Sequence, residues 1–345
     1  MEKKRNKPTA VDLFCGCGGL TTGLKKAGFR VLGAVDIDSL SVKTYKANHS
    51  EVNVFETDIS VLNPSEFKKT LGLSKKKLDL LAGCPPCQGF STMRTLNGAL
   101  DIDDPRNNLL FEFQRFVEEL LPRAIMLENV PGLAQDKRFS AFLRRMNKLG
   151  YKGEYRILNA ADYGVPQRRQ RLIYLAGRSK KISFAFPLRK RKTVRDAIGA
   201  LPKAGESGDA IHDLTEHRSP LIIERIKNIP KDGGSRYSLP EDLHLNCHQK
   251  CNGFKDVYGR MAWDKVAPTI TTGCFNPSKG RFLHPEEDRA ITMREAALLQ
   301  GFPRSYKFLD AKNKSGVALM IGNALPPPFI AAHALSIIKA INKKR

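Results

Sequence analysis

The sequence predicts an α/β protein with a mostly parallel sheet, helices on both of its faces and a second, smaller domain of irregular structure. Short apolar runs alternate with segments of helical periodicity through the first half of the chain, and this order is typical of parallel sheets with crossover helices. After Gly177 the periodicity fades, and Gly, Pro, His and basic residues become frequent. A chain of 345 residues is long enough for both domains.

Five apolar runs of the first half are predicted to be buried strands, at 9–14, 31–35, 52–55, 78–82 and 123–129. Between them, "GLTTGLKKAG", "SLSVKTYKAN" and "NLLFEFQRFVEELL" have helical spacing. "YRILNA" and "RLIYLAG" extend the sheet, and the final "PPFIAAHALSIIKAINKK" is predicted to be a helix that returns to it. We therefore place the larger domain at 1–177, completed by 289–345, and the smaller domain at 178–288.

The charge balance predicts a polyanionic partner. Lys and Arg number 58 against 35 acidic residues, a net charge of +23, and such an excess is typical of nucleic-acid-binding proteins. Eight basic residues and no acid lie between Arg178 and Arg195. We identify no signal peptide and no apolar stretch near the roughly 18 residues of a membrane helix. We therefore expect a cytoplasmic, nucleic-acid-binding protein whose seven cysteines form no disulfide framework.

A glycine-rich turn, "DLFCGCGGLTTG", joins the first strand to the first helix. Gly16, Gly18 and Gly19 allow a ligand to approach the backbone beside a helix N-terminus. Asp36 follows Gly16 by 20 residues, at the end of the second strand, where a carboxylate can bind ribose hydroxyls. Asp58 ends the third strand and could bind an adenine amino group. No phosphate-binding lysine accompanies them, so the pattern predicts a nucleoside cofactor rather than a nucleotide.

Three hypotheses fit the two cysteines of "GCPPCQGFS". Cys84 and Cys87 could form a redox pair. With "HSE" at 49–51 they could hold the zinc of a nucleobase deaminase. One cysteine could instead be a nucleophile, with Glu128 at the end of the next strand as its acid. The nucleophile hypothesis is favoured because it alone accounts for the adenosine pocket.

A second metal candidate is "HLNCHQKC", whose possible ligands are His244, Cys247, His248 and Cys251. Four ligands within eight residues do not match the paired spacing of zinc sites. The same spacing is one face of a helix, so we expect a local structural or DNA-facing role and no metal.

Six motifs, in order along nearly the whole chain, resemble those of the DNA (cytosine-5)-methyltransferase family. They are "DLFCGCGG", "GCPPCQGFS", "ENVPGL", "GVPQRRQRLIYLAG", "APTITTG" and "MIGNALPP". The resemblance implies a Rossmann-like S-adenosylmethionine-dependent methyltransferase domain and a small target-recognition domain. It also implies double-stranded DNA as substrate, no membrane, and a bacterial restriction-modification enzyme whose partner is a cognate restriction endonuclease acting on the same site. One cytosine is modified at a time, so a monomer would suffice.

The resemblance also implies roles for individual residues. Cys87 matches the nucleophile, and Arg169 matches an active-site arginine for the ring carbonyl oxygen. The implied catalytic residues are Cys87, Glu128, Asn129, Gln167, Arg169 and Arg171. The implied cofactor contacts are Phe14, Gly16, Gly18, Gly19, Asp36, Ile37, Asp58, Ile59, Pro85, Asn323 and Ala324. Most relatives have Glu at the position of Asp36, so either Asp36 or Asp38 could reach the ribose.

The chemistry explains these residue types. Carbon 5 of cytosine is a poor nucleophile until a thiolate adds at carbon 6. Glu128 near ring nitrogen 3 and Arg169 near the carbonyl oxygen would favour that addition. The base must first be extruded from the duplex, and we expect residues 92–104 to form a lid over it. The alternatives are a transfer-RNA methyltransferase of the same family, the zinc deaminase, and a non-catalytic DNA-binding protein.

Overall fold

The chain forms two compact units in a computed structural model that describes residues 7–74, 76–86, 108–214, 216–245 and 256–342. The larger unit contains 1–163, 170–187 and 325–345. The smaller unit contains 164–169 and 188–324. The predicted domains differ from these units mainly at 289–324, which belongs with the smaller unit.

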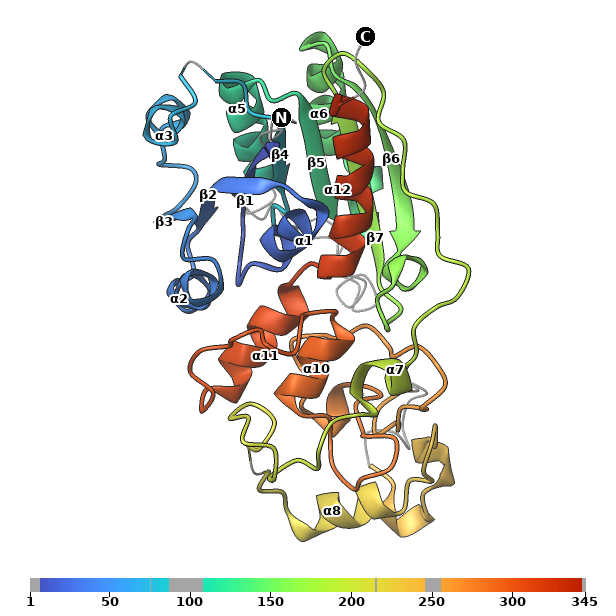
Figure 1. The fold of residues 1–345 in the computed structure, drawn as a ribbon. Helices are drawn as coiled ribbons and strands as arrows, with labels where there is room; N and C mark the ends of the chain where they lie inside the picture. The colour runs from blue at the N-terminus through green and yellow to red at the C-terminus, as the bar shows by residue number, and fades with distance from the viewer. Residues whose placement is uncertain (1–6, 75, 87–107, 215, 246–255, 343–345) are drawn as a thin grey trace, which may run out of the picture. The chain divides into compact units, whose positions relative to one another are not determined.

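The larger unit contains a seven-stranded sheet in the order β3-β2-β1-β4-β5-β7-β6 (Figure 1). Its strands are β1 (Thr9–Leu13), β2 (Arg30–Asp36), β3 (Asn53–Glu56), β4 (Leu80–Gly83), β5 (Ala124–Asn129), β6 (Lys152–Asn159) and β7 (Gln170–Gly177). The first five strands pair in parallel, and β7 is antiparallel to both β5 and β6. The predicted mostly parallel sheet is confirmed.

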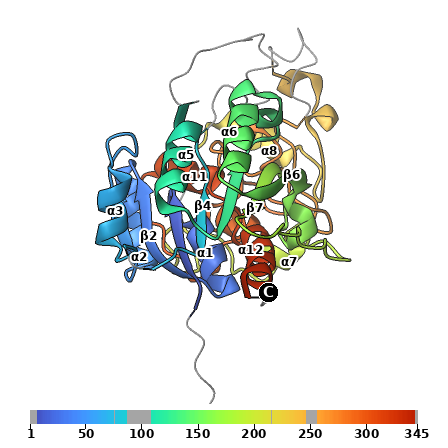
Figure 2. The same ribbon diagram turned by 90° about the horizontal axis from the view of Figure 1, so that it is seen from above.

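Helices cover both faces of this sheet. They are α1 (Gly19–Ala27), α2 (Ser39–Asn48), α3 (Pro64–Thr70), α5 (Leu109–Leu120), α6 (Lys137–Lys148) and α12 (Pro327–Asn342). Figure 2 shows α5 and α6 on one face and α1 and α12 on the other. Phe113 of α5 and Phe142 of α6 are fully buried against the strands, because apolar residues recur along one side of each helix.

The last helix returns to the first one, as the sequence predicts. Gly23 of α1 lies so close to α12 that a Cβ there would meet the Cβ of Ile330 at 2.6 Å. Glycine at this position therefore allows the two helix backbones to approach closely.

One described segment, Lys314–Asn342, is long and apolar enough to span a membrane, contrary to the expectation that no stretch of the chain has that composition. It comprises α11 (Lys314–Asn323) and α12, and 56% of its most apolar window is buried within the protein. A buried core helix has the same length and composition, so the segment does not by itself indicate a membrane.

The smaller unit is irregular, as predicted. Its described helices are α7 (Val194–Ile198), α8 (Pro220–Lys227), α10 (Met293–Leu299) and α11, with short 3-10 turns at Arg236–Ser238, Glu241–Leu243 and Pro277–Lys279. Its described β structure consists of isolated bridges, including Arg260 with Leu283. A small core joins Ile226 and Ile229 of the α8 region to Tyr258 and Leu283.

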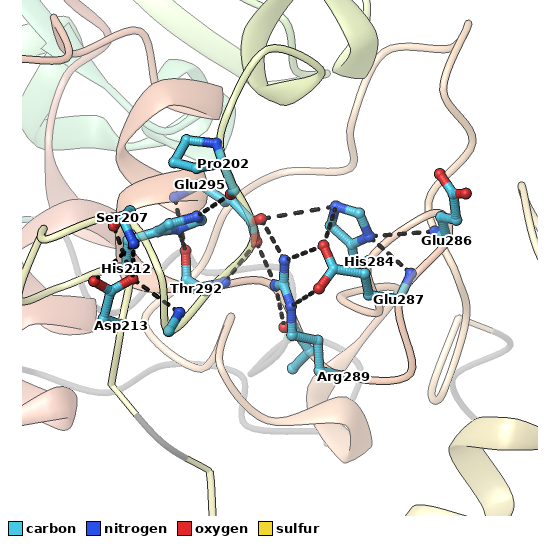
Figure 3. Close-up of polar contacts among 12 residues, drawn as sticks. Pro202, Ser207, His212, Asp213, His284, Glu286, Glu287, Arg289, Thr292 and Glu295 are labelled. Atoms are coloured by element: carbon cyan, nitrogen blue, oxygen red, sulfur yellow. Dashed lines mark hydrogen bonds and ion pairs between the residues drawn. The ribbon is translucent and has the colours of Figure 1, made fainter.

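A buried polar network stabilises α10 within the smaller unit (Figure 3). Both oxygens of Glu295 accept hydrogen bonds from Arg289 at 2.8 Å. Glu295 also accepts the backbone N–H of Thr292 at 2.7 Å, and the Thr292 hydroxyl bonds His212 at 2.8 Å. Thr292 and Glu295 thus form a capping box at the start of α10.

Candidate functional site

The glycine-rich turn follows β1 and leads directly into α1. Phe14 has a φ of 61°, Gly16 of 50° and Gly18 of 98°. The turn is closed by a hydrogen bond from Gly18 N to the Cys15 carbonyl at 2.9 Å. Gly18 is the N-cap of α1 and offers no side-chain cap, so backbone N–H groups of the first helical turn remain available to a ligand.

Asp36 is fixed beside this turn at the end of β2. Its Oδ2 accepts the Gly16 N–H at 2.7 Å and its Oδ1 accepts the Asp38 N–H at 3.0 Å. Burial raises the pKa of Asp36 despite these hydrogen bonds. Asp38 instead caps α2, accepting the Ser41 N–H at 2.8 Å. The geometry therefore favours Asp36 over Asp38 as the carboxylate next to the turn.

The segments after β2 and β3 add exposed apolar surface. Ile37 is 67% exposed, whereas Ile59 is buried. Asp58 is exposed, and its Oδ1 accepts the Ser60 N–H at 2.8 Å; this bond lowers the pKa of Asp58.

Arg115 of α5 fixes the loop that carries Asp58, a role that sequence reasoning missed. Its guanidinium donates to the carbonyls of Ile59 at 2.7 Å and Leu62 at 3.0 Å. Nothing in the sequence pattern signals a contact between residues more than 50 positions apart.

These residues fit an adenosyl group. A carboxylate beside a glycine turn suits ribose hydroxyls, the exposed Ile37 side chain suits one face of a purine, and Asp58 can accept its amino group. Asn323 and Ala324 lie at the end of α11 in the smaller unit, so their predicted contact with the cofactor stays a prediction.

Asp12 supports the turn from inside β1 and was not predicted. It is fully buried, and its Oδ2 accepts the Thr21 hydroxyl at 2.7 Å; the Thr21 and Tyr45 hydroxyls are also 2.7 Å apart. Burial raises the pKa of Asp12 to about 7. The chain thus buries a titratable carboxyl group directly beneath the candidate cofactor site.

Glu128 is the last residue but one of β5, at the same edge of the sheet, and is 1% exposed. Its Oε1 lies 2.9 Å from Arg171 Nε, and its Oε2 accepts the thiol of Cys84 at 2.6 Å. Parallel β4 and β5 pair Gly83 with Leu127, so the residues that follow them, Cys84 and Glu128, are neighbours. The structure thus brings two residues that were predicted to be catalytic, Glu128 and Arg171, together with Cys84, which was not predicted to be catalytic.

Asn129 and Pro85 meet beside this carboxyl group. Asn129 Nδ2 donates to the Pro85 carbonyl at 3.0 Å, and its Oδ1 accepts the Val130 N–H at 2.8 Å. Asn129 therefore links the backbone that follows Cys84 to the backbone that follows β5.

Gln167 and Arg169 are buried within the smaller unit, where they bind backbone groups. Gln167 Nε2 donates to the Leu299 carbonyl at 3.0 Å, and its Oε1 accepts the Ile270 N–H at 3.0 Å. Arg169 donates to the carbonyls of Ile270 at 3.1 Å and Gly322 at 3.0 Å. These contacts join distant segments of the unit, and the substrate role predicted for Arg169 stays a prediction.

Several predicted features lie outside the described residues. They are the nucleophile Cys87, the lid at 92–104, and Cys247, His248 and Cys251 of the second metal candidate. His244 is described, and its Nε2 lies 2.9 Å from the Leu239 carbonyl.

The zinc hypothesis finds no support in the described part of the chain, where no three His, Cys, Asp or Glu residues are grouped to hold a metal. His49 Nδ1 lies 3.2 Å from Lys25 Nζ, and Glu51 pairs with the same lysine at 2.6 Å. Burial and the lysine charge lower the pKa of His49 to about 4. The cation that His49 and Glu51 both contact is therefore the side chain of Lys25.

Comparison with known proteins identifies relatives over nearly the full length. Residues 9–339 match the family model described as C-5 cytosine-specific DNA methylase. The Type II methylase M.HgiDII of Herpetosiphon aurantiacus is 40% identical over 92% of this chain and 91% of its own. The Type II methyltransferase M1.HphI of Haemophilus parahaemolyticus is 34% identical over 96% of this chain and 87% of its own.

Solved structures agree with these matches. A crystal structure described as a DNA modification methyltransferase encoded within an E. coli prophage has a TM-score of 0.70 and 27% identity, covering 97% of this chain and all of that one. The Spodoptera frugiperda DNMT2 mutant has a TM-score of 0.62 at 19% identity, covering 96% of this chain and 99% of its own, and shares the fold.

Proposed function

Because the chain belongs to the C-5 cytosine-specific DNA methylase family and is a DNA cytosine-5 methyltransferase, we propose that it methylates a cytosine flipped out of a specific duplex sequence. The observation that carries this proposal is the buried Glu128 carboxyl group, which lies at the carboxyl edge of the sheet between Cys84 and Arg171. Family membership also overturns the zinc deaminase and the non-catalytic DNA-binding alternatives.

In the proposed mechanism the Cys87 thiolate adds to carbon 6 of cytosine. The electron pair of the 5,6 double bond becomes available at carbon 5 as ring nitrogen 3 receives a proton from Glu128. S-adenosylmethionine, when bound, supplies an electrophilic methyl group for carbon 5. A base then removes the carbon-5 proton, the thiolate leaves, which restores the 5,6 double bond, and ring nitrogen 3 returns its proton to Glu128. Burial of Glu128 excludes water from the proton that it transfers.

Arg171, rather than Arg169, is proposed to bind the ring carbonyl oxygen. Arg171 contacts Glu128 directly, whereas Arg169 donates to two backbone carbonyls. Removing one preorganised donor costs about 10²–10³ in kcat in acyl-transfer enzymes. Arg171→Lys, which keeps a positive charge beside the buried Glu128, is therefore expected to lower kcat about 100-fold with little loss of stability, and Arg169→Met to lower stability first. A stable Arg169→Met protein that has lost its activity would restore the original assignment.

The larger unit is proposed to hold S-adenosylmethionine between the glycine-rich turn and Asp36. The supporting observation is that both carboxylate oxygens of Asp36 are oriented by backbone N–H groups, at 2.7 and 3.0 Å. Ile37 and Asp58 would then contact the adenine.

The biological role is proposed from the relatives, which are named Type II enzymes. Methylation would protect cytoplasmic host DNA from a restriction endonuclease that cuts the same sequence, and the enzyme would act as a monomer. Plasmid DNA from cells that express the protein should resist one endonuclease specificity, and a Cys87→Ser variant should give no resistance.

The decisive experiment measures transfer of a labelled methyl group from S-adenosylmethionine to mixed-sequence duplex DNA by wild type and Cys87→Ser. Label on cytosine carbon 5 with wild type alone supports the reaction and the nucleophile, and mapping of the label gives the recognition sequence. Label with both proteins would refute the role of Cys87. Label on transfer RNA and none on DNA would refute the substrate.

A further inference from the structure

The smaller unit contains a strongly basic pocket that no step of the mechanism uses. Its volume is about 600 Å³, and the charged residues that line it are Arg168, Arg191, Arg260, Lys265, Arg281 and Asp264. The lining acid is already paired, because Arg195 donates to both oxygens of Asp264 at 2.8 and 3.0 Å. Arg260 and Arg281 also pair with acids, Asp288 and Asp256, each at 2.9 Å, so the excess of positive charge comes from the other lining cations, Arg168 and Lys265 among them.

Two of the lining arginines make the frame of the pocket. Arg260 is fully buried, and it donates to the carbonyls of His284 at 2.8 Å and Ile226 at 2.9 Å. Arg281 donates to the carbonyls of Gly234 and Arg260, each at 2.9 Å. Because these donors are engaged by the backbone, Arg260 and Arg281 fix the shape of the pocket and leave little capacity for a ligand.

Arg168 and Lys265 differ from this pair. Both side chains are exposed, and neither has an ion-pair or hydrogen-bond partner among the residues that the structure describes. Their backbones are nevertheless fixed: Arg168 N donates to the Ala267 carbonyl at 2.8 Å, and the Lys265 carbonyl accepts the Val194 N–H at 2.9 Å. The pocket thus holds two available cations on an ordered frame.

Arg168 points away from the interior because it lies between two buried residues, Gln167 and Arg169. Gln167 bridges in parallel to Ala267, and side chains of extended backbone alternate between its two sides. The same alternation that buries Gln167 and Arg169 therefore sends Arg168 into the pocket.

We propose that this pocket binds a phosphodiester group of the DNA, with Arg168 and Lys265 contacting the phosphate oxygens. The inference rests on the proposed function. A phosphate suits the site because it accepts several charge-assisted hydrogen bonds, and the DNA backbone is the anion that the reaction supplies. Arg168 precedes Arg171 by three residues, which extend over at most about 11 Å. The phosphate is therefore one close along the strand to the target cytosine.

The test compares two double variants of the full-length protein. Arg168→Gln/Lys265→Gln removes both available cations. Lys148→Gln/Lys152→Gln is the matched control, since both lysines are exposed. Lys152 pairs with Gly177, which pairs with Ala124 at the start of β5, so the control lies at the edge of the sheet away from Glu128. Affinity for a short duplex is measured by fluorescence anisotropy from 50 to 300 mM salt.

Each phosphate contact contributes about 0.9 to the slope of log affinity against log salt. The pocket variant should lose about 0.9 units of slope and bind all sequences more weakly, and the control should match wild type. A second series places one neutral methylphosphonate at each position flanking the mapped cytosine. One position should weaken wild type and leave the pocket variant unaffected.

An unchanged slope in a folded pocket variant would overturn the proposal. An equal loss of slope in both double variants would also overturn it, because the effect would then belong to total charge. Failure of the proposed function has a different result: the wild-type protein would transfer no methyl group to duplex DNA, whatever the slopes.

Discussion

Each unit of the molecule buries one glutamate beside an arginine, and the two carboxyl groups are held differently. Glu295 accepts three hydrogen bonds, two from Arg289 at 2.8 Å and one from the Thr292 N–H at 2.7 Å. Glu128 has the single Nε of Arg171 at 2.9 Å and the thiol of Cys84 at 2.6 Å. Both glutamates are 1% exposed. The two sites therefore differ in the hydrogen-bond partners of the carboxyl group and not in its burial.

The difference lies in how fully the protein's own groups occupy each carboxyl group. Burial alone would raise the pKa of Glu295, but the Arg289 hydrogen bonds and charge lower it. Glu295 is thus kept ionised in a bidentate pair, the strongest geometry for arginine and carboxylate. A carboxyl group has about four acceptor positions, and a thiol is a weak donor. Among the described residues, Glu128 therefore has fewer and weaker hydrogen-bond partners than Glu295.

The largest effects should come from changing each glutamate to glutamine. Glu128→Gln is expected to lower kcat by about 10²–10⁴-fold, because the proposed proton donor is lost, with a smaller loss of stability, because Arg171 contacts Glu128 through a single nitrogen. Glu295→Gln should lower the free energy of unfolding by about 2 kcal/mol, because Arg289 keeps its pair with Glu287 but loses the charged, bidentate pair with Glu295. Urea denaturation and methyl-transfer assays on both variants check this. Equal losses of stability would show that the two sites are alike.

Asp12 extends the comparison to a buried carboxyl group whose pKa is raised. Burial raises its pKa from 3.8 to about 7 in the folded protein, so its contribution to stability is fully present below about pH 4. That contribution is lost as the pH rises to 7, at about 1.4 kcal/mol per pH unit. Asp12→Asn cannot ionise. Wild type should therefore lose stability relative to Asp12→Asn between pH 5 and 7, as measured by urea denaturation. A constant difference would contradict the burial argument.

At the proposed cofactor site, variants of Asp36 and Asp38 compare a carboxylate that is expected to bind a ligand with one that caps a helix. Asp36→Asn should weaken S-adenosylmethionine binding about 30-fold, because a hydrogen bond to a charged group contributes about 2 kcal/mol. Asp38→Asn is the control, since asparagine caps helices as well as aspartate does. Isothermal titration calorimetry on both variants measures the difference. A larger loss in Asp38→Asn would move the ribose contact to that residue.

Cys84 should have the smallest effect. Cys84→Ala removes one neutral hydrogen bond to Glu128, worth about 1 kcal/mol, and should lower kcat about fivefold with little change in KM. Cys84→Ser should recover most of the rate, because its hydroxyl also donates. A loss confined to KM would place Cys84 in substrate binding instead.

The sequence predicted most elements of the larger unit, because apolar periodicity reports burial locally. The sequence did not predict the order of the strands in the sheet, because no local pattern indicates that β7 lies between β5 and β6. The partners of Glu128 escaped prediction for a related reason. Cys84 reaches Glu128 through the register of β4 and β5, in which Gly83 pairs with Leu127, and the sequence does not contain that register.

The two arginines of the Gln-x-Arg-x-Arg motif illustrate a second limit. The resemblance of "GVPQRRQRLIYLAG" to the family motif predicted both Arg169 and Arg171 to be catalytic. The chain passes from the smaller to the larger unit between Arg169 and Gln170. Their side chains consequently meet different surroundings, which only the three-dimensional division of the chain shows.

The return of α12 to α1 has a consequence for synthesis of the protein on the ribosome. The larger unit begins with β1 at Thr9, yet Phe329, Ile330 and Ile337 of α12 are among its fully buried residues. The apolar side of α1 must remain uncovered while the intervening chain is translated, a state in which nascent proteins are prone to aggregate. Completion of the larger unit is thus delayed until α12 has been translated, so a truncated product that ends before α12 would expose a core surface to chaperones and proteases.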